Sequence, residues 1–236
     1  MFSKKEYLSL VISSIVLSFI FSFAEWGYEE FSASIGIRNL LLAFIISLMV
    51  LLLREYIRKI ISKKIGFETE VKLWSIKKDL KLLNIKQLPI GVIISLLAIF
   101  ISNGSFKFAA VSNYDLKNYS KKDLKRRYKY IRGIEEAIIA SLGAIVPTLL
   151  ALIFNILNVE KAVSIASIIA IYSIIPFPSQ DGIKMYFGSL WYYILIMFFV
   201  IFSLVLIKSM GSIPSLILSV ILSIVITSIT FYQLNK

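Results

Sequence analysis

The chain contains no cysteine and no histidine. Their absence excludes disulfides, cysteine nucleophiles and proton relays through imidazole, and it excludes a zinc site of the usual Cys/His kind. Acidic residues are also scarce, with 14 Asp and Glu against 26 Lys and Arg, which gives a formal net charge of +12. The basic residues lie between apolar runs, so we interpret them as topology signals and as contacts for anionic lipid head groups. Nucleic acid is not an expected partner.

Apolar residues are in excess, because 58% of the chain is hydrophobic and the mean hydropathy is +0.83. Soluble domains are only about 45–50% apolar. Several runs approach or exceed the roughly 18 residues that a membrane-spanning helix needs, which excludes a soluble fold. We expect one membrane domain over residues 1–236, with spans at about Leu8–Ala24, Ile37–Leu53, Ile134–Leu157, Ala162–Phe187, Leu190–Ile207 and Ser212–Tyr232.

A seventh apolar run, Leu88–Ser102, is short and has basic residues on both sides. A single crossing between two basic loops conflicts with the positive-inside rule, so we expect this run to be re-entrant or peripheral. About six transmembrane helices then remain, with both termini and both basic loops on the cytoplasmic side of the cell membrane. The acidic loop Glu25–Glu30 would face outward. The predicted fold class is thus an all-α polytopic membrane protein.

Three smaller features complete this topology. Phe67–Ile76 alternates apolar and polar residues, which indicates a short strand at the cytoplasmic surface. The basic segment Ser120–Arg127 is typical of a helix that lies on lipid head groups. Phe19–Ala24 offers a poor small-residue cleavage site, so we expect the first apolar run to be a retained span rather than a signal peptide.

Ionisable residues cluster at the predicted cytoplasmic end of the second span, in Leu53-Arg54-Glu55-Tyr56-Ile57-Arg58. Arg54 and Arg58 are four residues apart and therefore share one face of a helix. A basic helix end with a local ion pair is the simplest interpretation of this pattern when it is taken alone.

A second cluster interrupts an apolar helix at Ile174-Ile175-Pro176-Phe177-Pro178-Ser179-Gln180-Asp181-Gly182. Irregular backbone at membrane depth is tolerated only where protein or a water-filled cavity covers it. A carboxylate directly after such a break indicates a site, with Pro176, Pro178, Asp181 and Gly182 as candidate binding residues. The alternative interpretation is a plain helix end followed by a polar loop.

Together the two clusters resemble the motifs of the site-2 protease family of intramembrane zinc metalloproteases. Arg54–Arg58 stands where the family has His-Glu-x-x-His, and Ile65–Val71 is similar to the strand that follows it. Ala140–Pro147 resembles the family's small-residue helix, and Ile175–Gly182 resembles its Pro-x-Pro-x-x-Asp-Gly motif. The resemblance covers about residues 40–188. The spans that lie outside it are 8–24, 190–207 and 212–232.

The resemblance implies zinc ligands at positions 54, 58 and 181, with Glu55 as general base. Both histidine positions are arginine, however, and guanidinium has no lone pair to donate to a metal. We therefore expect no metal, no cofactor and no catalytic residue among these degenerate positions. Arginine could supply the positive charge of the missing zinc, which predicts an ion pair of Arg54 or Arg58 with Asp181 and with Glu55 nearby. A separation above about 8 Å would contradict this prediction.

The favoured function is a proteolytically inactive, site-2-protease-like membrane protein, not an enzyme, that binds or regulates membrane-protein segments. Its expected partners are lipid head groups and a transmembrane segment or an active protease relative. A transporter or channel is an alternative, because broken helices and intramembrane charge are typical of that class. An active protease with a Glu55–Asp181 carboxylate pair is a further alternative, although adjacent arginines would keep both carboxyls ionised. A purely structural membrane subunit is the remaining hypothesis.

Overall fold

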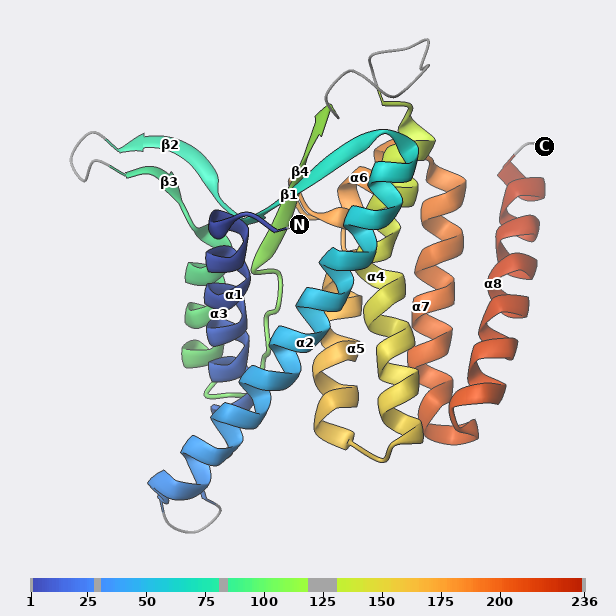
Figure 1. Cartoon of the computed structure of the whole chain (residues 1–236). Helices are drawn as coiled ribbons and strands as arrows, with labels where there is room; N and C mark the ends of the chain where they lie inside the picture. Colours follow the sequence, from blue (N-terminus) through green and yellow to red (C-terminus); the bar gives the residue numbers. More distant parts are fainter. Residues whose placement is uncertain (1, 28–30, 81–84, 119–130, 235–236) are drawn as a thin grey trace. The chain divides into compact units, whose positions relative to one another are not determined.

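The computed structural model describes residues 2–27, 31–80, 85–118 and 131–234. The predicted head-group helix Ser120–Arg127 lies outside the described residues. The helices are α1 (Lys4–Ser22), α2 (Ala33–Ile65), α3 (Ile90–Ile101), α4 (Gly133–Ile156), α5 (Glu160–Ile174), α6 (Asp181–Gly188), α7 (Leu190–Met210) and α8 (Ser212–Leu234). The strands are β1 (Phe67–Leu73), β2 (Ile76–Leu80), β3 (Ile85–Leu88) and β4 (Ser112–Asn118). Figure 1 shows this order along the chain.

The described contacts divide the chain into two compact units, residues 1–52 with 69–116 and residues 53–68 with 117–236. In the first unit α1 and α3 lie side by side (Figure 1). A capping box starts α1, because the Ser3 hydroxyl accepts from the Glu6 amide while the Glu6 carboxylate accepts from the Ser3 amide. The other carboxylate oxygen of Glu6 accepts from the amide of Val71, which joins the start of α1 to β1.

The strands form two separate two-stranded sheets, β1 with β4 and β2 with β3. The second is an antiparallel hairpin that pairs Ile76 with Leu88 and leads directly into α3. The prediction of a strand at Phe67–Ile76 is confirmed by β1, which has an alternating burial pattern. The other strands extend the predicted single strand into a small β layer.

The second unit is built around α4, which packs against both α5 and α7, and α8 packs against α7 (Figure 1). Small residues on α4, such as Ala140 and Ala144, are fully buried and allow close helix packing. A serine pair, Ser203 and Ser219, joins α7 to α8 by a 2.8 Å hydrogen bond. Gly133 and Gly188 meet backbone to backbone, which brings the start of α4 against the end of α6.

Five of the described helices, α1, α2, α4, α7 and α8, are long and apolar enough to cross a membrane. This agrees with the predicted multi-pass helical membrane protein. The predicted span at residues 162–187 consists of two shorter helices, α5 with 15 residues and α6 with 8. The predicted re-entrant run forms α3, whose 12 residues are about 18 Å long at 1.5 Å per residue. The second span continues as helix well beyond Leu53, to Ile65.

Candidate functional site

Three charged residues are buried on the part of α2 that belongs to the second unit. Arg54 is 4% exposed, and Glu55 and Arg58 are fully buried. The Glu55 carboxylate accepts from both neighbours: Arg54 Nε lies 2.8 Å from Oε1, and Arg58 Nη1 lies 2.8 Å from Oε1 and 3.0 Å from Oε2. Glu55 and Arg58 are three residues apart and share a helix face, whereas the adjacent Arg54 reaches the same carboxylate through its Nε.

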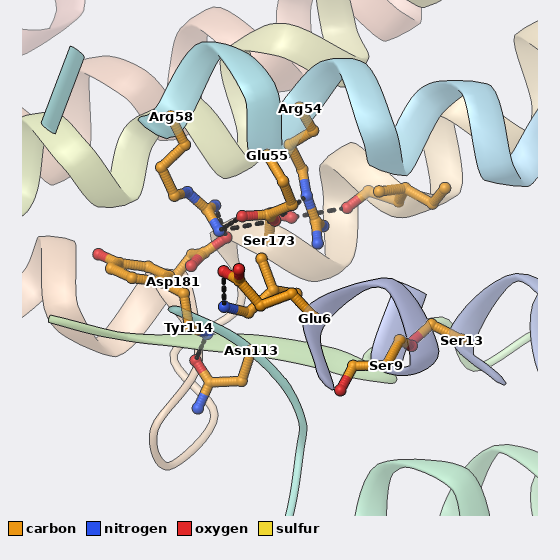
Figure 2. A network of polar contacts seen from close by, with 12 residues as sticks. Glu6, Ser9, Ser13, Arg54, Glu55, Arg58, Asn113, Tyr114, Ser173 and Asp181 are labelled. Carbon is orange, nitrogen blue, oxygen red and sulfur yellow. Dashed lines mark hydrogen bonds and ion pairs between the residues drawn. The ribbon is translucent and has the colours of Figure 1, made fainter. Parts of the chain in front are cut away.

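The fourth charge comes from the broken helix. α5 ends at Ile174, the backbone then runs through the two prolines, and Asp181 is the first residue of α6. Ser179 has a positive φ of 65°, which marks the sharp turn before α6. Arg58 Nη2 donates to Asp181 Oδ2 at 2.6 Å (Figure 2). The Asp181 side chain is 6% exposed, so the ion pair is almost completely removed from solvent.

A third segment, α4, contacts the ion pair through Gly143. A Cβ at this position would collide with Oδ2 of Asp181 and would lie 2.5 Å from Nη2 of Arg58. Only a residue without a side chain leaves room for the ion pair here. The helix that the sequence identified by its small residues, Ala140–Pro147, therefore contacts the two charged segments directly.

The predicted ion pair is confirmed, and Arg58 rather than Arg54 makes it. Arg54 instead bonds to Glu55, so the cluster holds two guanidinium groups and two carboxylates and has no net formal charge. A buried charge is tolerated when it is paired and hydrogen-bonded. Each of these groups has an ion-pair partner, and Oδ1 of Asp181 is a buried oxygen that accepts no hydrogen bond from the described residues. Within the described ranges, no group of three or more Asp, Glu, His or Cys side chains is placed to hold a metal ion.

The other candidate binding residues lie along the break between α5 and α6. Pro176 and Pro178 are exposed. Gly182 is buried against the backbone carbonyls of Ile174 and Ile175, where a Cβ would collide. Pro176 also lies at the end of an apolar groove between α5 and α7, with a volume of about 1150 Å³. Binding by these residues remains a prediction.

Sequence reasoning missed Gly143 as an individual residue and missed the groove entirely. Gly143 could have been singled out, because it is the one glycine inside the small-residue helix segment Ala140–Pro147. The groove has no local signal, since its walls come from helices separated by a turn and by α6. Helix–helix spacing of this kind depends on packing, which single-helix patterns do not reveal.

No known protein family, no curated protein and no solved structure matches this chain.

Proposed function

We propose that this chain is a multi-pass membrane protein with a site-2-protease-like core that does not hydrolyse peptide bonds and binds segments of other membrane proteins. The observation that carries the proposal is the buried Arg58–Asp181 ion pair. It joins the two sequence segments that resemble the family's metal-binding motifs, and Gly143 of the small-residue segment lies against both side chains.

The charges of the cluster explain how such a core could remain folded without zinc. Removing a dication from a buried site leaves its carboxylates uncompensated, and an uncompensated buried charge costs several kcal/mol, about 3–5 in typical cases. Arg58 bonds to both carboxylates, and Arg54 bonds to Glu55. The two fixed cations thus replace the charge of the metal but none of its coordination chemistry.

The same contacts argue against hydrolysis at this site. A glutamate that serves as general base must accept a proton from water, and both oxygens of Glu55 already accept from Arg58. A carboxylate dyad would need Glu55 and Asp181 to share a proton. Arg58 instead donates to both carboxylates and occupies the position between them that a shared proton would need.

Binding of a membrane-protein segment would use the break between α5 and α6. Asp181 Oδ1 is buried and accepts no hydrogen bond from the described residues. A peptide N–H from an extended segment is a donor that would satisfy it. The exposed prolines Pro176 and Pro178 border this position and donate no backbone hydrogen bond of their own.

The topology that we propose has six crossings, with α5 as the sixth and α3 as the non-crossing helix. Both termini and the basic loops then face the cytoplasm of the cell membrane, where Lys and Arg contact anionic head groups. The cluster lies near the cytoplasmic end of α2, and an active protease relative is the second class of partner that would fit this position.

Metal analysis tests the replacement of zinc by arginine. The full-length protein, purified in detergent and dialysed against zinc, should carry no stoichiometric metal. The double variant Arg54→His/Arg58→His restores the ligand pattern with Asp181, and it should approach one zinc per chain. Stoichiometric zinc in the unaltered protein, lost on Glu55→Gln or Asp181→Asn, would overturn the proposal.

Site-specific photocrosslinking tests the binding of a segment. A photoreactive phenylalanine analogue at Phe177, beside the break, should crosslink in native membranes to an apolar segment of another membrane protein, identified by peptide mapping. The matched control is the same analogue at Phe231, which is 49% exposed on α8. Equal crosslinking from both positions to lipid or to unrelated proteins would contradict a binding role for the break.

A transporter is a second candidate, favoured by the discontinuous pair α5 and α6 with a buried ionisable residue at the break. Purified protein in liposomes distinguishes the two functions, because only a transporter would move ions or solutes across the bilayer. Flux that disappears in Asp181→Asn would support the transporter and count against the binding function.

A further inference from the structure

An apolar groove runs between α5 and α7 of the second unit, and none of the four charge-cluster residues lines it. Its walls are aliphatic and thioether side chains, including Ile168, Ile171, Met197, Ile201 and Leu204. Since α5 has 15 residues, the groove is about 22 Å long at 1.5 Å per residue. Its volume is about 1150 Å³.

One end of the groove is charged. Glu160 in the first turn of α5 and Lys208 in the last turn of α7 both line it, together with Asn155 of α4. Among the residues that the structure describes, neither Glu160 nor Lys208 makes a side-chain hydrogen bond or an ion pair. The Asn155 amide nitrogen donates to Ser212, which leaves the amide oxygen as an acceptor.

The opposite end of the groove is lined by no charged residue in the described part of the chain. It is formed by Ile174, Ile175, Pro176 and Tyr193, and the Tyr193 hydroxyl donates to the carbonyl of Ile174 at 3.2 Å. The groove therefore has an apolar body, one end whose polar group is satisfied, and one end with a separate anion and cation. This distribution of polarity matches an amphiphile with a zwitterionic head.

Glu160 and Lys208 also have a local explanation, because an acidic residue at a helix N-terminus and a basic residue at a C-terminus stabilise their own helices. That effect does not require both side chains to line one groove. The length of the groove fits a lipid, because one acyl chain needs to reach only about 15 Å, half the hydrocarbon core.

We infer that the α5–α7 groove is a binding site for a membrane phospholipid whose head group carries a phosphate and a primary ammonium. Lys208 contacts the phosphate, Glu160 accepts hydrogen bonds from the ammonium, and one acyl chain lies along the aliphatic walls. The site shares Pro176 with the break between α5 and α6, but it contains none of the ion-pair residues. Its lipid contacts do not depend on the outcome of the zinc test.

Native mass spectrometry of the full-length protein tests the inference. The protein in detergent is exposed to an equimolar mixture of phosphatidylethanolamine, phosphatidylcholine and phosphatidylglycerol, and the retained lipids are counted. Phosphatidylethanolamine should be retained in preference to the other two. Lys208→Gln should reduce its retention about two- to fivefold, the effect of losing one exposed ion pair of 0.5–1 kcal/mol.

Glu160→Gln should give a different result, because it removes the anion and keeps the cation. Retention should then shift from phosphatidylethanolamine towards phosphatidylglycerol. The matched control is Lys64→Gln, which changes an exposed lysine that is also in the last turn of a helix, and it should leave the lipid preference unaltered. Equal retention of all three lipids by every variant would show that the groove holds only unselected boundary lipid. That result would overturn the inference.

Blocking the groove provides a second measurement. The chain has no native cysteine, so Ser167→Cys on the groove wall can be labelled uniquely with a bulky maleimide. Labelling should abolish preferential retention of phosphatidylethanolamine while the protein remains folded by circular dichroism. Retention that survives labelling would overturn the inference, as would a crosslinker at position 167 that captures a protein segment instead of lipid.

Discussion

The guanidinium of Arg58 and the carboxylate of Asp181 lie 2.6 Å apart, although 123 residues separate them in the sequence. The pair connects the part of α2 that follows Leu53 to the first residue of α6, and Gly143 of α4 packs against it. Three segments of the second unit therefore meet at one buried interaction. The strength of this ion pair should determine how much the contact between α2 and α6 contributes to the stability of the fold.

Removing one partner of this pair should destabilise the protein strongly. Arg58→Met leaves Asp181 buried without its cation, and Asp181→Leu leaves part of the guanidinium unpaired, so each should lower the free energy of unfolding by about 3–5 kcal/mol. The double variant Arg58→Met/Asp181→Leu should cost less than the sum of the two by at least 1 kcal/mol, within the range of coupled neighbours. Unfolding in detergent, followed by circular dichroism, measures all three.

Lys63→Met is the control for these variants, because Lys63 is exposed near the end of the same helix. Its effect should stay within about 0.5 kcal/mol. If Arg58→Met changed stability no more than Lys63→Met, the ion pair would not stabilise the contact between α2 and α6.

Gly143→Ala tests the close approach of α4. Alanine favours a helix over glycine by about 1 kcal/mol, but its Cβ would collide with Oδ2 of Asp181. We expect a net loss of about 1–3 kcal/mol from overpacking. In the Asp181→Ala background the same change should cost less, because the nearer of the two colliding atoms is gone and only Nη2 of Arg58 remains close. Leu149→Ala on the partly exposed face of α4 serves as control, and a Gly143→Ala variant as stable as the unaltered protein would refute the contact.

The ion pair could be predicted because buried charges constrain their own partners. Two arginines and a glutamate on one apolar helix need opposite charge or solvent, and Asp181 follows the clearest helix break in the chain. The sequence did not indicate whether Arg54 or Arg58 pairs with Asp181. Both share a helix face, and only the position of α6 decides which guanidinium reaches Asp181.

The boundaries that differed from prediction have identifiable physical causes. α2 continues through the charged residues after Leu53 because no Gly or Pro lies between Leu53 and Gly66. Gly66 has a positive φ of 100° and directly follows the last helical residue. β4 was missed because Ser112–Asn118 contains polar and charged residues at most positions and lacks a clear alternation. Its pairing with β1 supplies the strand character that its own sequence does not show.

The pair between Lys72 and Asp115 should respond to pH and salt in a specific direction. Their side chains lie 2.5 Å apart on β1 and β4, and the hydrogen bond to Asp115 raises the pKa of Lys72 above its ordinary 10.5. A raised pKa means that the stabilisation is complete below about pH 10 and is lost as pH rises through the folded-state value. Both side chains are partly exposed, so the contribution is below about 1 kcal/mol.

The measurement compares the melting temperature of the unaltered protein with that of Lys72→Gln. The unaltered protein should melt at a slightly higher temperature than Lys72→Gln at low salt. This difference in melting temperature should shrink at 1 M salt and vanish at strongly alkaline pH. Lys5→Gln, an exposed lysine at the start of α1, is the control. A difference that grows with rising pH would show that the ion pair does not stabilise the fold through protonated Lys72.

The proposed six crossings can be tested residue by residue, because a chain without native cysteine accepts single cysteines cleanly. Ser34→Cys and Ser209→Cys are exposed positions that six crossings place outside, whereas Lys63→Cys should be inside. A membrane-impermeant maleimide applied to intact cells should therefore label the first two and reach the third only after permeabilisation. Ser209 is the decisive position. If α5 and α6 together returned to the side from which α5 began, α7 would run in the opposite direction and Ser209 would be protected, which would leave five crossings in place of six.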